Sequence, residues 1–269
     1  CTARKPGESF RFLVIGDTNP ALSNATSELF EQTLPSNPDF VVHTGDLQYY
    51  ASFIESWAIW WPKMQPLLAQ GAFLPAVGNH EFEQPNEFEL YYKRFFDGAG
   101  FDGTTRYYRF SSGGVWFFSV DSEQELGPDS EQGKWLIEGL AFAKTQPGFR
   151  FSIVYLHRPW ITCGDTGDNP ERREAWEPVF IDNDVKLVLF GHMHGYERFE
   201  VPGLTYITAA GGGAHLGDVS ENDDRPTCEY RKAAGKFYNA TIIEVGPDKL
   251  RGITKDNKGE VRDEFEIPL

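Results

Sequence analysis

The sequence is poor in cysteine, methionine and basic side chains. Its 269 residues contain three Cys and two Met, and 25 Lys and Arg face 40 Asp and Glu, which gives a formal net charge of −15. Such an acidic chain repels nucleic acid over most of its surface, and it has no basic stripe with interleaved aromatic residues, so we expect no nucleic acid as a specific partner. It also contains no apolar run long enough to span a membrane, no signal peptide and no repeat.

The three cysteines are compatible with either an exported or a cytosolic protein. Cys163 and Cys228 lie in polar segments rich in Gly and Pro, where we expect loops. In an exported protein they could form a disulfide, whereas in the cytosol both would remain thiols. The opening Cys1-Thr-Ala resembles a bacterial lipoprotein after its signal is removed, although an artificial start of the chain would look the same. We expect an exported protein, periplasmic, secreted or at the cell surface, that contacts a membrane only through a lipid on Cys1.

Five short motifs concentrate the residue types that bind metal ions. They are GDTN at Gly16–Asn19, GDLQY at Gly45–Tyr49, GNHE at Gly78–Glu81, VYLH at Val154–His157 and GHMH at Gly191–His194. Together they supply Asp, Asn and Tyr side chains and four of the six His of the chain. Oxygen and nitrogen donors of these types hold divalent and trivalent transition metals. The motifs therefore predict a site for a pair of metal ions.

Each motif lies at the end of a short apolar run. The runs cover residues 12–15, 40–42, 73–77, 151–156 and 185–190. Unbroken apolar runs bounded by Gly are typical of strands buried on both faces. Because ligands gather at the carboxyl ends of such strands in layered α/β folds, five motifs far apart in the sequence can converge on one site.

The rest of the pattern alternates between helices and strands. We expect helices at residues 21–34, 52–69, 86–96, 130–144 and 172–181, and two strand pairs, at 105–110 with 115–120 and at 237–245 with 250–254. This order predicts two packed mixed sheets flanked by helices. The length suits one domain over residues 1–269, with residues 1–9 as a tail or tether.

In this order the motifs resemble those of the calcineurin-like metallophosphoesterases, and most closely those of the purple acid phosphatases. The motifs of that narrower family read DxG, GDxxY, GNH(D/E), VxxH and GHxH, and the second to fifth match here without exception. Residues 155–198 and 208–213 are also similar to that family. The first motif departs from it, because Asp17-Thr18-Asn19 replaces DxG. The resemblance implies an α/β fold, a four-layer αββα sandwich of two mixed sheets flanked by helices.

The resemblance also implies two half-sites that share Asp46. The first would hold Fe(III) through Asp17, Asp46, Tyr49 and His194. The second would hold a divalent ion (Fe, Zn or Mn) through Asp46, Asn79, His157 and His192. A phenolate with carboxylates suits a hard trivalent ion, whereas imidazoles and an amide suit a divalent one.

The implied reaction is the hydrolysis of phosphate monoesters of small molecules. A metal-bound hydroxide would attack phosphorus, and His80 would protonate the leaving alkoxide as a general acid. Glu81 or a neighbour of Asp46 would orient His80. Three further residues are candidates for contact with the substrate, namely Asn19, Arg158 and His215, and the loops at 122–130, 162–170 and 214–232 would shape the rim.

Each of these residues also has a purely structural interpretation. Asp17 and Asp46 could be turn residues after strands, a common role for aspartate. Tyr49 could be a residue of the packed interior. His43 fits a hydrogen-bonded position behind the ligands better than ligation, and an ordinary loop position is the default for His215.

Two other functions remain open at this point. One is a phosphodiesterase of the wider family with two divalent ions and with Tyr49 outside the metal site. The other is a non-catalytic surface module that uses its metals to bind an anion.

Overall fold

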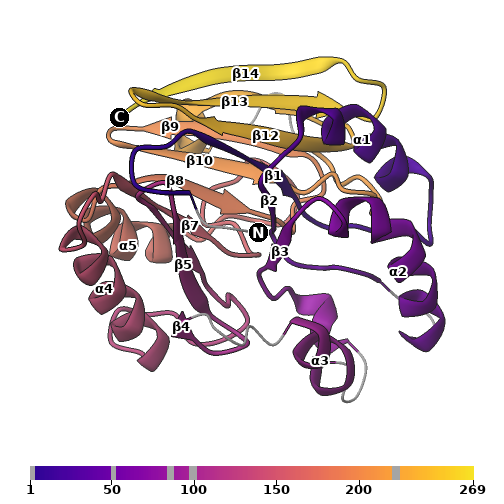
Figure 1. Cartoon of the computed structure of the whole chain (residues 1–269), viewed down its shortest axis with the longest axis horizontal. Coiled ribbons are helices and arrows are strands. Elements are labelled where there is room, and N and C mark those ends of the chain that lie inside the picture. The colour runs from indigo at the N-terminus through magenta and orange to yellow at the C-terminus, as the bar shows by residue number, and fades with distance from the viewer. Residues whose placement is uncertain (1–3, 50–52, 84–87, 97–101, 220–224) are drawn as a thin grey trace.

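The computed structural model describes residues 4–49, 53–83, 88–96, 102–219 and 225–269. Two mixed β-sheets lie face to face, and helices cover the outer side of each sheet (Figure 1). This arrangement confirms the α/β class and the four-layer αββα sandwich.

The first sheet has six strands and combines a parallel and an antiparallel part. β1 (Phe10–Ile15), β2 (Phe40–His43) and β3 (Ala72–Pro75) run parallel, whereas β12 (Asn239–Val245), β13 (Lys249–Asp256) and β14 (Val261–Pro268) are antiparallel to their neighbours. The order across the sheet is β14-β13-β12-β1-β2-β3. β1 and β2 are almost wholly buried, as expected for strands that are covered on both faces.

The second sheet has eight strands. They are β4 (Asp102–Gly103), β5 (Tyr108–Ser112), β6 (Val115–Ser119), β7 (Phe151–Tyr155), β8 (Val185–Phe190), β9 (Tyr196–Val201), β10 (Leu204–Ala209) and β11 (Arg231–Gly235). Their order is β11-β9-β10-β8-β7-β6-β5-β4. The pairs β6–β7, β7–β8 and β8–β10 are parallel, so the carboxyl ends of these strands share one edge.

Three apolar clusters fill the spaces between the four layers. Between the sheets, the rings of Phe12 and Phe40 stack with centroids 5.4 Å apart, and Phe117 of the second sheet meets both edge-on at 5.3 and 5.4 Å. Because side chains alternate along a strand, Leu13 and Ile15 of β1 face the helices on the other side of the sheet. One apolar layer therefore lies between the two sheets, and another lies between the first sheet and its helices.

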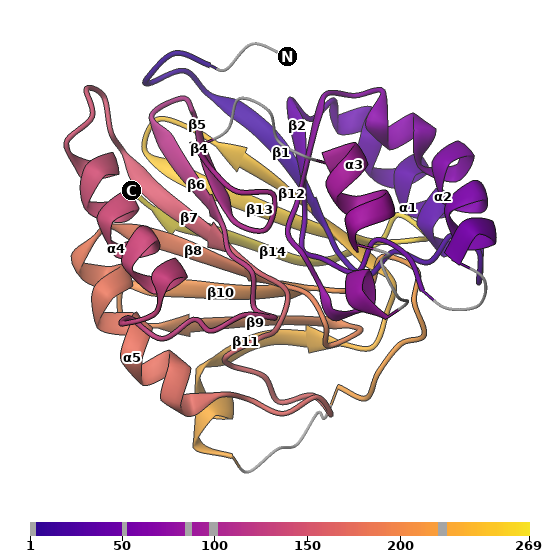
Figure 2. The same cartoon turned by 90° about the horizontal axis from the view of Figure 1, so that it is seen from below.

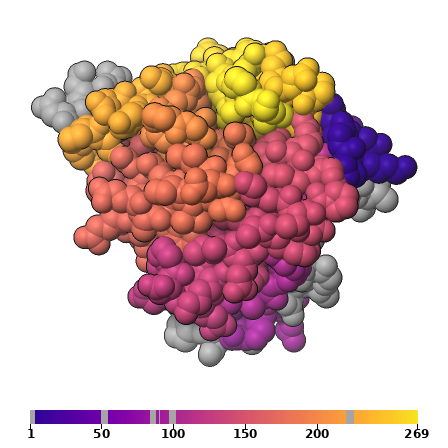
Figure 3. Space-filling view, turned by 90° about the vertical axis from the view of Figure 1, so that its left-hand side faces the viewer, coloured from indigo at the N-terminus to yellow at the C-terminus, as the bar shows by residue number. Residues whose placement is uncertain are grey.

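The helices form the two outer layers. α1 (Ala25–Thr33) and α2 (Phe53–Leu68) cover the first sheet, and α4 (Glu131–Lys144) and α5 (Pro170–Asp182) cover the second. A π-helical turn at Phe88–Tyr92 leads into the short α3 (Lys93–Phe96). Single 3₁₀ turns lie at Leu34–Ser36, Asn79–Phe82 and Pro226–Tyr230. Figure 2 shows the two helical layers on opposite sides of the sheets, and Figure 3 views the α4–α5 side, with the C-terminal residues in yellow along its upper edge.

Most of the expected elements are confirmed, with shifted ends. The five apolar runs form β1, β2, β3, β7 and β8, and both expected strand pairs are present. The first helix begins at Ala25, not at residue 21, and the helix expected at 86–96 is a π turn followed by one turn of α-helix. Residues 52, 86 and 87 of the expected helices lie outside the described residues. α4 and α5 (which begins at Pro170, not at residue 172) each follow a side-chain cap, because Ser130 Oγ and Asn169 Oδ1 accept from the backbone N–H groups of Gly133 and Arg172.

The sequence pattern did not reveal β9, β10, β11 or β14. β9 carries Glu197 and Arg198 among its buried residues, which hides its strand pattern. Each of these charges is paired inside the fold: Arg231 Nη1 lies 3.1 Å from Glu197 Oε1, and Arg198 Nε lies 2.7 Å from Asp263 Oδ2 of β14. Buried charges are stable only with such partners, and those partners are remote in the sequence.

The start of the described chain lies against the second sheet. Gly7 N donates to Gly113 O over 3.1 Å, and Gly113 N donates to Arg4 O over 2.9 Å. Cys1 lies outside the described residues. None of the helices formed by the described residues combines the length and the hydropathy of a membrane-spanning segment.

A disulfide joins Cys163, in the loop after β7, to Cys228 in the turn at Pro226–Tyr230. The two Cα atoms are 5.9 Å apart, and 65 residues separate the two positions in the sequence. The structure therefore contains the disulfide that the sequence left open. Because the bridge closes a long loop, it restricts the unfolded chain strongly.

We expect the double variant Cys163→Ala/Cys228→Ala to lose about 2–4 kcal/mol of unfolding free energy in urea. The same loss should follow when a reducing agent is added to the wild type, whereas the reducing agent should not change the double variant. A wild type whose unfolding midpoint is insensitive to reduction would contradict this expectation.

Candidate metal centre

The five motifs meet at the carboxyl ends of β1, β2 and β3 of the first sheet and of β7 and β8 of the second. Their loops are tied backbone to backbone: Asp17 N donates to Gly45 O over 3.1 Å, and Gly191 N donates to His157 O over 2.9 Å. The two sheets are joined there as well, since the Asp17 carboxylate accepts from the backbone N–H of His192 at 3.0 and 3.1 Å. The structure thus brings together side chains that are up to 177 positions apart, from Asp17 to His194.

One group of donors contains Asp17, Tyr49 and His194. The Tyr49 hydroxyl lies 2.9 Å from Asp17 Oδ1 and 3.0 Å from His194 Nε2, and His194 Nε2 lies 3.2 Å from Asp17 Oδ1. Asp17 and Tyr49 are buried, and His194 is partly exposed. A carboxylate of Asp46 lies within reach of the same group. All four residues that the resemblance implies for the first half-site are therefore adjacent.

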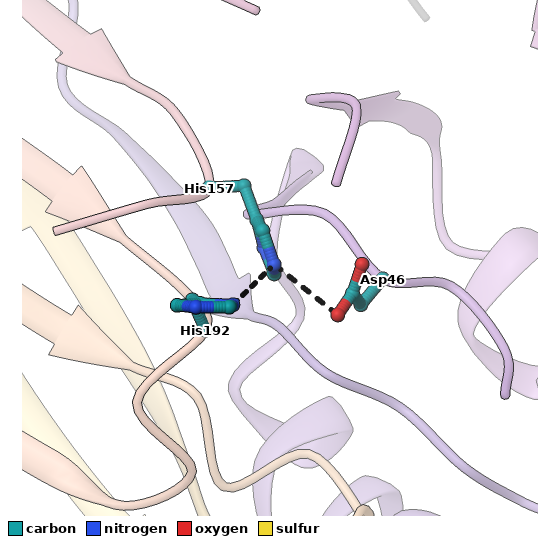
Figure 4. A group of neighbouring side chains, drawn as sticks. All are labelled: Asp46, His157 and His192. Atoms are coloured by element: carbon teal, nitrogen blue, oxygen red, sulfur yellow. Dashed lines mark hydrogen bonds and ion pairs between the residues drawn. The ribbon is translucent and has the colours of Figure 1, made fainter. Parts of the chain in front are cut away.

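A second group of donors is centred on His157. Its Nε2 lies 3.1 Å from Asp46 Oδ2, 3.1 Å from Asn79 Oδ1 and 3.2 Å from His192 Nδ1. Figure 4 shows the rings of His157 and His192 and the carboxylate of Asp46 directed toward one another. Asp46 belongs to both groups, as a ligand shared by two ions would.

The donor set fits cations. Asp46 Oδ2 is buried and receives no hydrogen bond from a described residue, although His157 Nε2 is only 3.1 Å away. Three ring nitrogens, two carboxylates, an amide oxygen and a phenol oxygen converge, and these are the atoms that bind transition metals. In each of the two groups, three of the converging ligand atoms lie within 4.8 Å of one another.

Backbone carbonyls orient two of the imidazoles. His157 Nδ1 lies 2.9 Å from Thr44 O, and His194 Nδ1 lies 2.6 Å from His215 O. A carbonyl accepts only from a protonated nitrogen, so each ring carries a proton on Nδ1 and turns Nε2 toward the centre. His192 is reversed: its Nδ1 faces His157, and its Nε2 lies 3.0 Å from Arg158 Nη1.

Burial and charge perturb the titration of these groups strongly. Burial lowers the pKa of His157, but the Asp46 carboxylate outweighs it and raises that pKa to about 10. Burial and then His157 lower the pKa of His192 to about 3. Burial, followed by Asp17 and Asp46, raises the pKa of Tyr49 well above 10. The carboxylates therefore favour positive charge here, and a bound cation would displace the protons that the ligands carry.

Three of the candidate ligands have a left-handed backbone. The φ angles are 58° at Asp17, 54° at Asp46 and 67° at His192. Residues with a Cβ adopt this region at a cost of the order of 1–3 kcal/mol, and such positions cluster at functional sites. The sharp turns allow a side chain to enter the centre directly after a strand.

Two glycines of the motifs permit the close approach of the loops. A Cβ on Gly78 would overlap the backbone and side chain of Asp46. A Cβ on Gly191 would lie 2.6 Å from Thr44 O and 2.8 Å from the Asp17 carboxylate. Any side chain at either position would push the ligand-bearing loops apart.

Glu81 holds two of the motifs together. Its Oε2 accepts from the N–H groups of Gly78 at 2.7 Å and Asp46 at 3.1 Å, and its Oε1 accepts from Leu47 N at 2.8 Å. The side chain is buried, and burial, followed by the charge of Asp46, raises its pKa to about 8. Glu81 therefore positions the Asp46 loop and does not orient His80, which corrects the first alternative of the sequence analysis.

His80 lies at the edge of the centre and pairs with Glu83. Its Nδ1 is 2.7 Å from Glu83 Oε2, its Nε2 is 3.9 Å from Asp46 Oδ2, and its ring centroid is 4.2 Å from that of Tyr49. The side chain is 18% exposed, so it is open to solvent on one side. The i, i+3 spacing of His80 and Glu83 was the signal in the sequence that could have identified this pair.

The other candidates surround the ligand groups. Asn19 is buried, and Arg158 reaches His192 while Glu123 holds its guanidinium at 2.7 and 3.0 Å. His215 is exposed and contributes its backbone carbonyl to His194. His43 is buried behind the ligands, with Nε2 3.1 Å from Thr18 Oγ1, which agrees with a supporting position.

Comparison with known proteins agrees with this geometry. Residues 10–196, more than half of the chain, match the calcineurin-like phosphoesterase family. The chain belongs to that family. In this calcineurin-like phosphoesterase, the matched segment contains all seven candidate ligands, listed as Asp17, Asp46, Tyr49, Asn79, His157, His192 and His194.

The similar proteins include plant purple acid phosphatases. Probable purple acid phosphatase 20 of Arabidopsis thaliana is 30% identical, and the alignment covers 90% of this chain and 61% of that protein. The nucleotide pyrophosphatase/phosphodiesterase of Hordeum vulgare is 27% identical, with 73% and 63% covered. Other matched relatives are named probable inactive purple acid phosphatases. Purple acid phosphatase PPD1 of yellow lupin seeds shares the fold, with a TM-score of 0.77 at 18% identity over 99% of this chain and 55% of that one. The chain spans less than two thirds of the length of these proteins.

We expect Glu81→Gln to weaken this metal centre. The amide would set an N–H group against a backbone N–H, so the unfolding free energy should fall by about 1–3 kcal/mol. Metal retained after dialysis, measured by elemental analysis, should fall with it.

Glu83→Gln is the matched control, since it makes the same change two positions along the chain, at a carboxylate that contacts the His80 ring. It should keep its metal and its stability. Equal metal retention in Glu81→Gln and the wild type would contradict the positioning role of Glu81.

Proposed function

We propose that the protein is a metal-dependent phosphoester hydrolase, similar to purple acid phosphatases, that hydrolyses phosphate monoesters. The observation that carries the proposal is the pair of donor groups that share Asp46, with His80 at their edge. Family membership supports phosphoester hydrolysis in general. The similarity to a probable purple acid phosphatase supports the narrower assignment.

In this proposal two cations occupy the two donor groups. Asp17, Asp46, Tyr49 and His194 would hold Fe(III), and a divalent ion (Fe, Zn or Mn) would be held by Asp46 with Asn79, His157 and His192. When bound, the ions supply Lewis-acid chemistry: they lower the pKa of water and offset the negative charge of a phosphoryl group. The phenol of Tyr49 and the two carboxylates of the first group suit a hard trivalent ion.

His80 is the proposed general acid. Its Nδ1–H is directed to Glu83, so the proton available for transfer is on Nε2, the nitrogen that faces the centre. As the bond from phosphorus to the leaving oxygen breaks and water adds to phosphorus, this proton would pass to the leaving oxygen. The carboxylate of Glu83 would stabilise the imidazolium before the transfer and keep the ring in place.

The charge of the chain restricts the substrates. With a net charge of −15, the surface repels large polyanions, whereas salt screens this repulsion for a small ester that reaches the centre. Small phosphoesters are therefore the proposed substrate class, and nucleic acid is not a proposed partner.

Export is the proposed location. A disulfide between Cys163 and Cys228 persists in oxidising compartments and is rare in the cytosol. This supports a periplasmic, secreted or surface-bound protein, and a lipid on Cys1 stays part of the proposal.

We expect His80→Ala to lower the turnover number for phenyl phosphate by about 10²–10⁴-fold while metal content is unchanged. The backbone N–H of His80, which donates to Asp46 Oδ1 at 2.9 Å, survives this substitution. Glu83→Gln should cause a smaller fall. A His80→Ala variant with full activity would remove His80 from the mechanism, and a metal-loaded wild type that hydrolyses no phosphoester would leave the non-catalytic anion-binding module.

A phosphodiesterase with two divalent ions is the second candidate. The relative from Hordeum vulgare that is named a nucleotide pyrophosphatase/phosphodiesterase favours it. In that case Tyr49 would lie beside the ions without binding one.

A visible spectrum separates the two candidates, because a phenolate bound to Fe(III) absorbs visible light. We expect the purified protein to be coloured and Tyr49→Phe to lose the band. Tyr107→Phe, which changes a tyrosine just before β5 whose ring contacts Trp135, should keep it. A colourless, iron-free protein that is active with Mn(II) or Zn(II), or a Tyr49→Phe variant with an unchanged spectrum, would favour the phosphodiesterase.

A further inference from the structure

We propose that a cavity beside His192 is a second anion-binding subsite. It would take a phosphate or carboxylate that the substrate carries a few bonds away from the phosphoester to be cleaved. The inference rests on the proposed function, because that function locates the reacting phosphoryl group at the metal centre. It narrows the substrate class from small phosphoesters to those with a second negative group.

The cavity is large enough for such a group and adjoins the centre. Its volume is about 230 Å³, which is nearly eight times the roughly 30 Å³ that one water occupies in the liquid. Its lining includes Ser122, Arg158, Trp160, Asp168, Arg172 and His192. His192 belongs to both places, since its Nδ1 lies 3.2 Å from His157 Nε2 while its ring also lines the cavity.

Arg172 supplies an unpaired positive charge. Its side chain is partly buried, and its guanidinium forms no hydrogen bond or ion pair with any residue that the structure describes. Its neighbours are paired: Arg173 lies 3.1 Å from Glu177, and Arg158 is held by Glu123. In a chain with far more carboxylates than cations, a guanidinium left without one at a cavity wall is suited to an anion from outside.

The other charges of the cavity balance. The carboxylate of Asp168 lies 3.8 Å from Arg225 Nη1, and Glu123 offsets Arg158. Arg172 therefore leaves an excess of positive charge in the lining. Trp160 adds an indole N–H that is buried and has no acceptor among the described residues. Unsatisfied buried donors favour a ligand that accepts hydrogen bonds.

The wall of the cavity is held in place before any ligand binds. Asn169 N donates to Trp160 O over 3.0 Å, which closes the loop between them. Within this loop, Thr162 Oγ1 donates to Glu197 Oε2 over 2.5 Å, and Cys163 forms the disulfide. A preformed site loses little conformational entropy on binding.

The test compares the affinities of phosphonates that are not hydrolysed. One set has identical length and differs in its far end: propylphosphonate, 3-phosphonopropionate and ethane-1,2-bisphosphonate. A second set is one carbon longer: butylphosphonate, 4-phosphonobutyrate and propane-1,3-bisphosphonate. The dissociation constants are measured by calorimetry on the protein as purified, with its metal content determined.

We expect a compound with a second anion to bind about tenfold more tightly than its alkyl analogue at one of the two lengths. The far group that gives the larger ratio, carboxylate or phosphonate, identifies the second anion. Arg172→Gln should bring the ratio close to one, and Arg172→Lys should retain part of it. Arg94→Gln, the same change at an exposed arginine of α3 without a described carboxylate partner, should keep the wild-type ratio.

The proposal is overturned if Arg172→Gln has the same ratio as the wild type, whether that ratio is large or near one. The outcome does not depend on catalysis, because no phosphonate is turned over. Absence of phosphoester hydrolysis would therefore overturn the proposed function and leave the affinity ratios to decide on the subsite.

Discussion

The site depends on one buried carboxylate. Asp46 is 1% exposed, belongs to both donor groups and has its pKa lowered by His157 and His80 against the effect of burial. A buried negative charge is tolerated only when positive charge and hydrogen bonds surround it. Much of the surrounding structure provides them: His157 lies 3.1 Å from Asp46 Oδ2, and His80 N donates to Oδ1.

The chain accepts local strain to hold that carboxylate. Asp46 has a left-handed backbone, and a Cβ on Gly78 would overlap Asp46. The carboxylate of Glu81 accepts a hydrogen bond from the backbone N–H of Asp46. The left-handed backbone of Asp46 costs stability by itself, whereas the hydrogen bonds of Glu81 stabilise the loop. The stacked phenylalanines between the sheets and the hydrogen bonds between the loops offset this cost, because they fix both sheets relative to each other.

Much of the fold and of the candidate site could be predicted from the sequence. Four apolar runs followed by Gly-Asp, Gly-Asn or Gly-His, and a fifth followed by His157, predicted five buried strands and the residues after them, since burial and sharp turns leave local signals. The sequence could not show which of Glu81 and Glu83 binds the Asp46 loop and which contacts His80. Both are acidic and close to His80, and only the folded loops determine which of them faces three backbone N–H groups. β9 was missed for a related reason: Glu197 and Arg198 look like surface charges until Arg231 and Asp263 arrive from distant parts of the chain.

Both donor groups take residues from both sheets. His194 follows β8 of the second sheet and meets Asp17 and Tyr49 of the first, and His157 of the second sheet meets Asp46 and Asn79 of the first. A cation in either group would thus act as a cross-link between the two halves of the sandwich. Ligands that bind only the native state stabilise it in proportion to the logarithm of their free concentration. The resistance of this fold to heat would then follow the supply of metal in its surroundings, so that scarcity would affect the persistence of the protein as well as its chemistry.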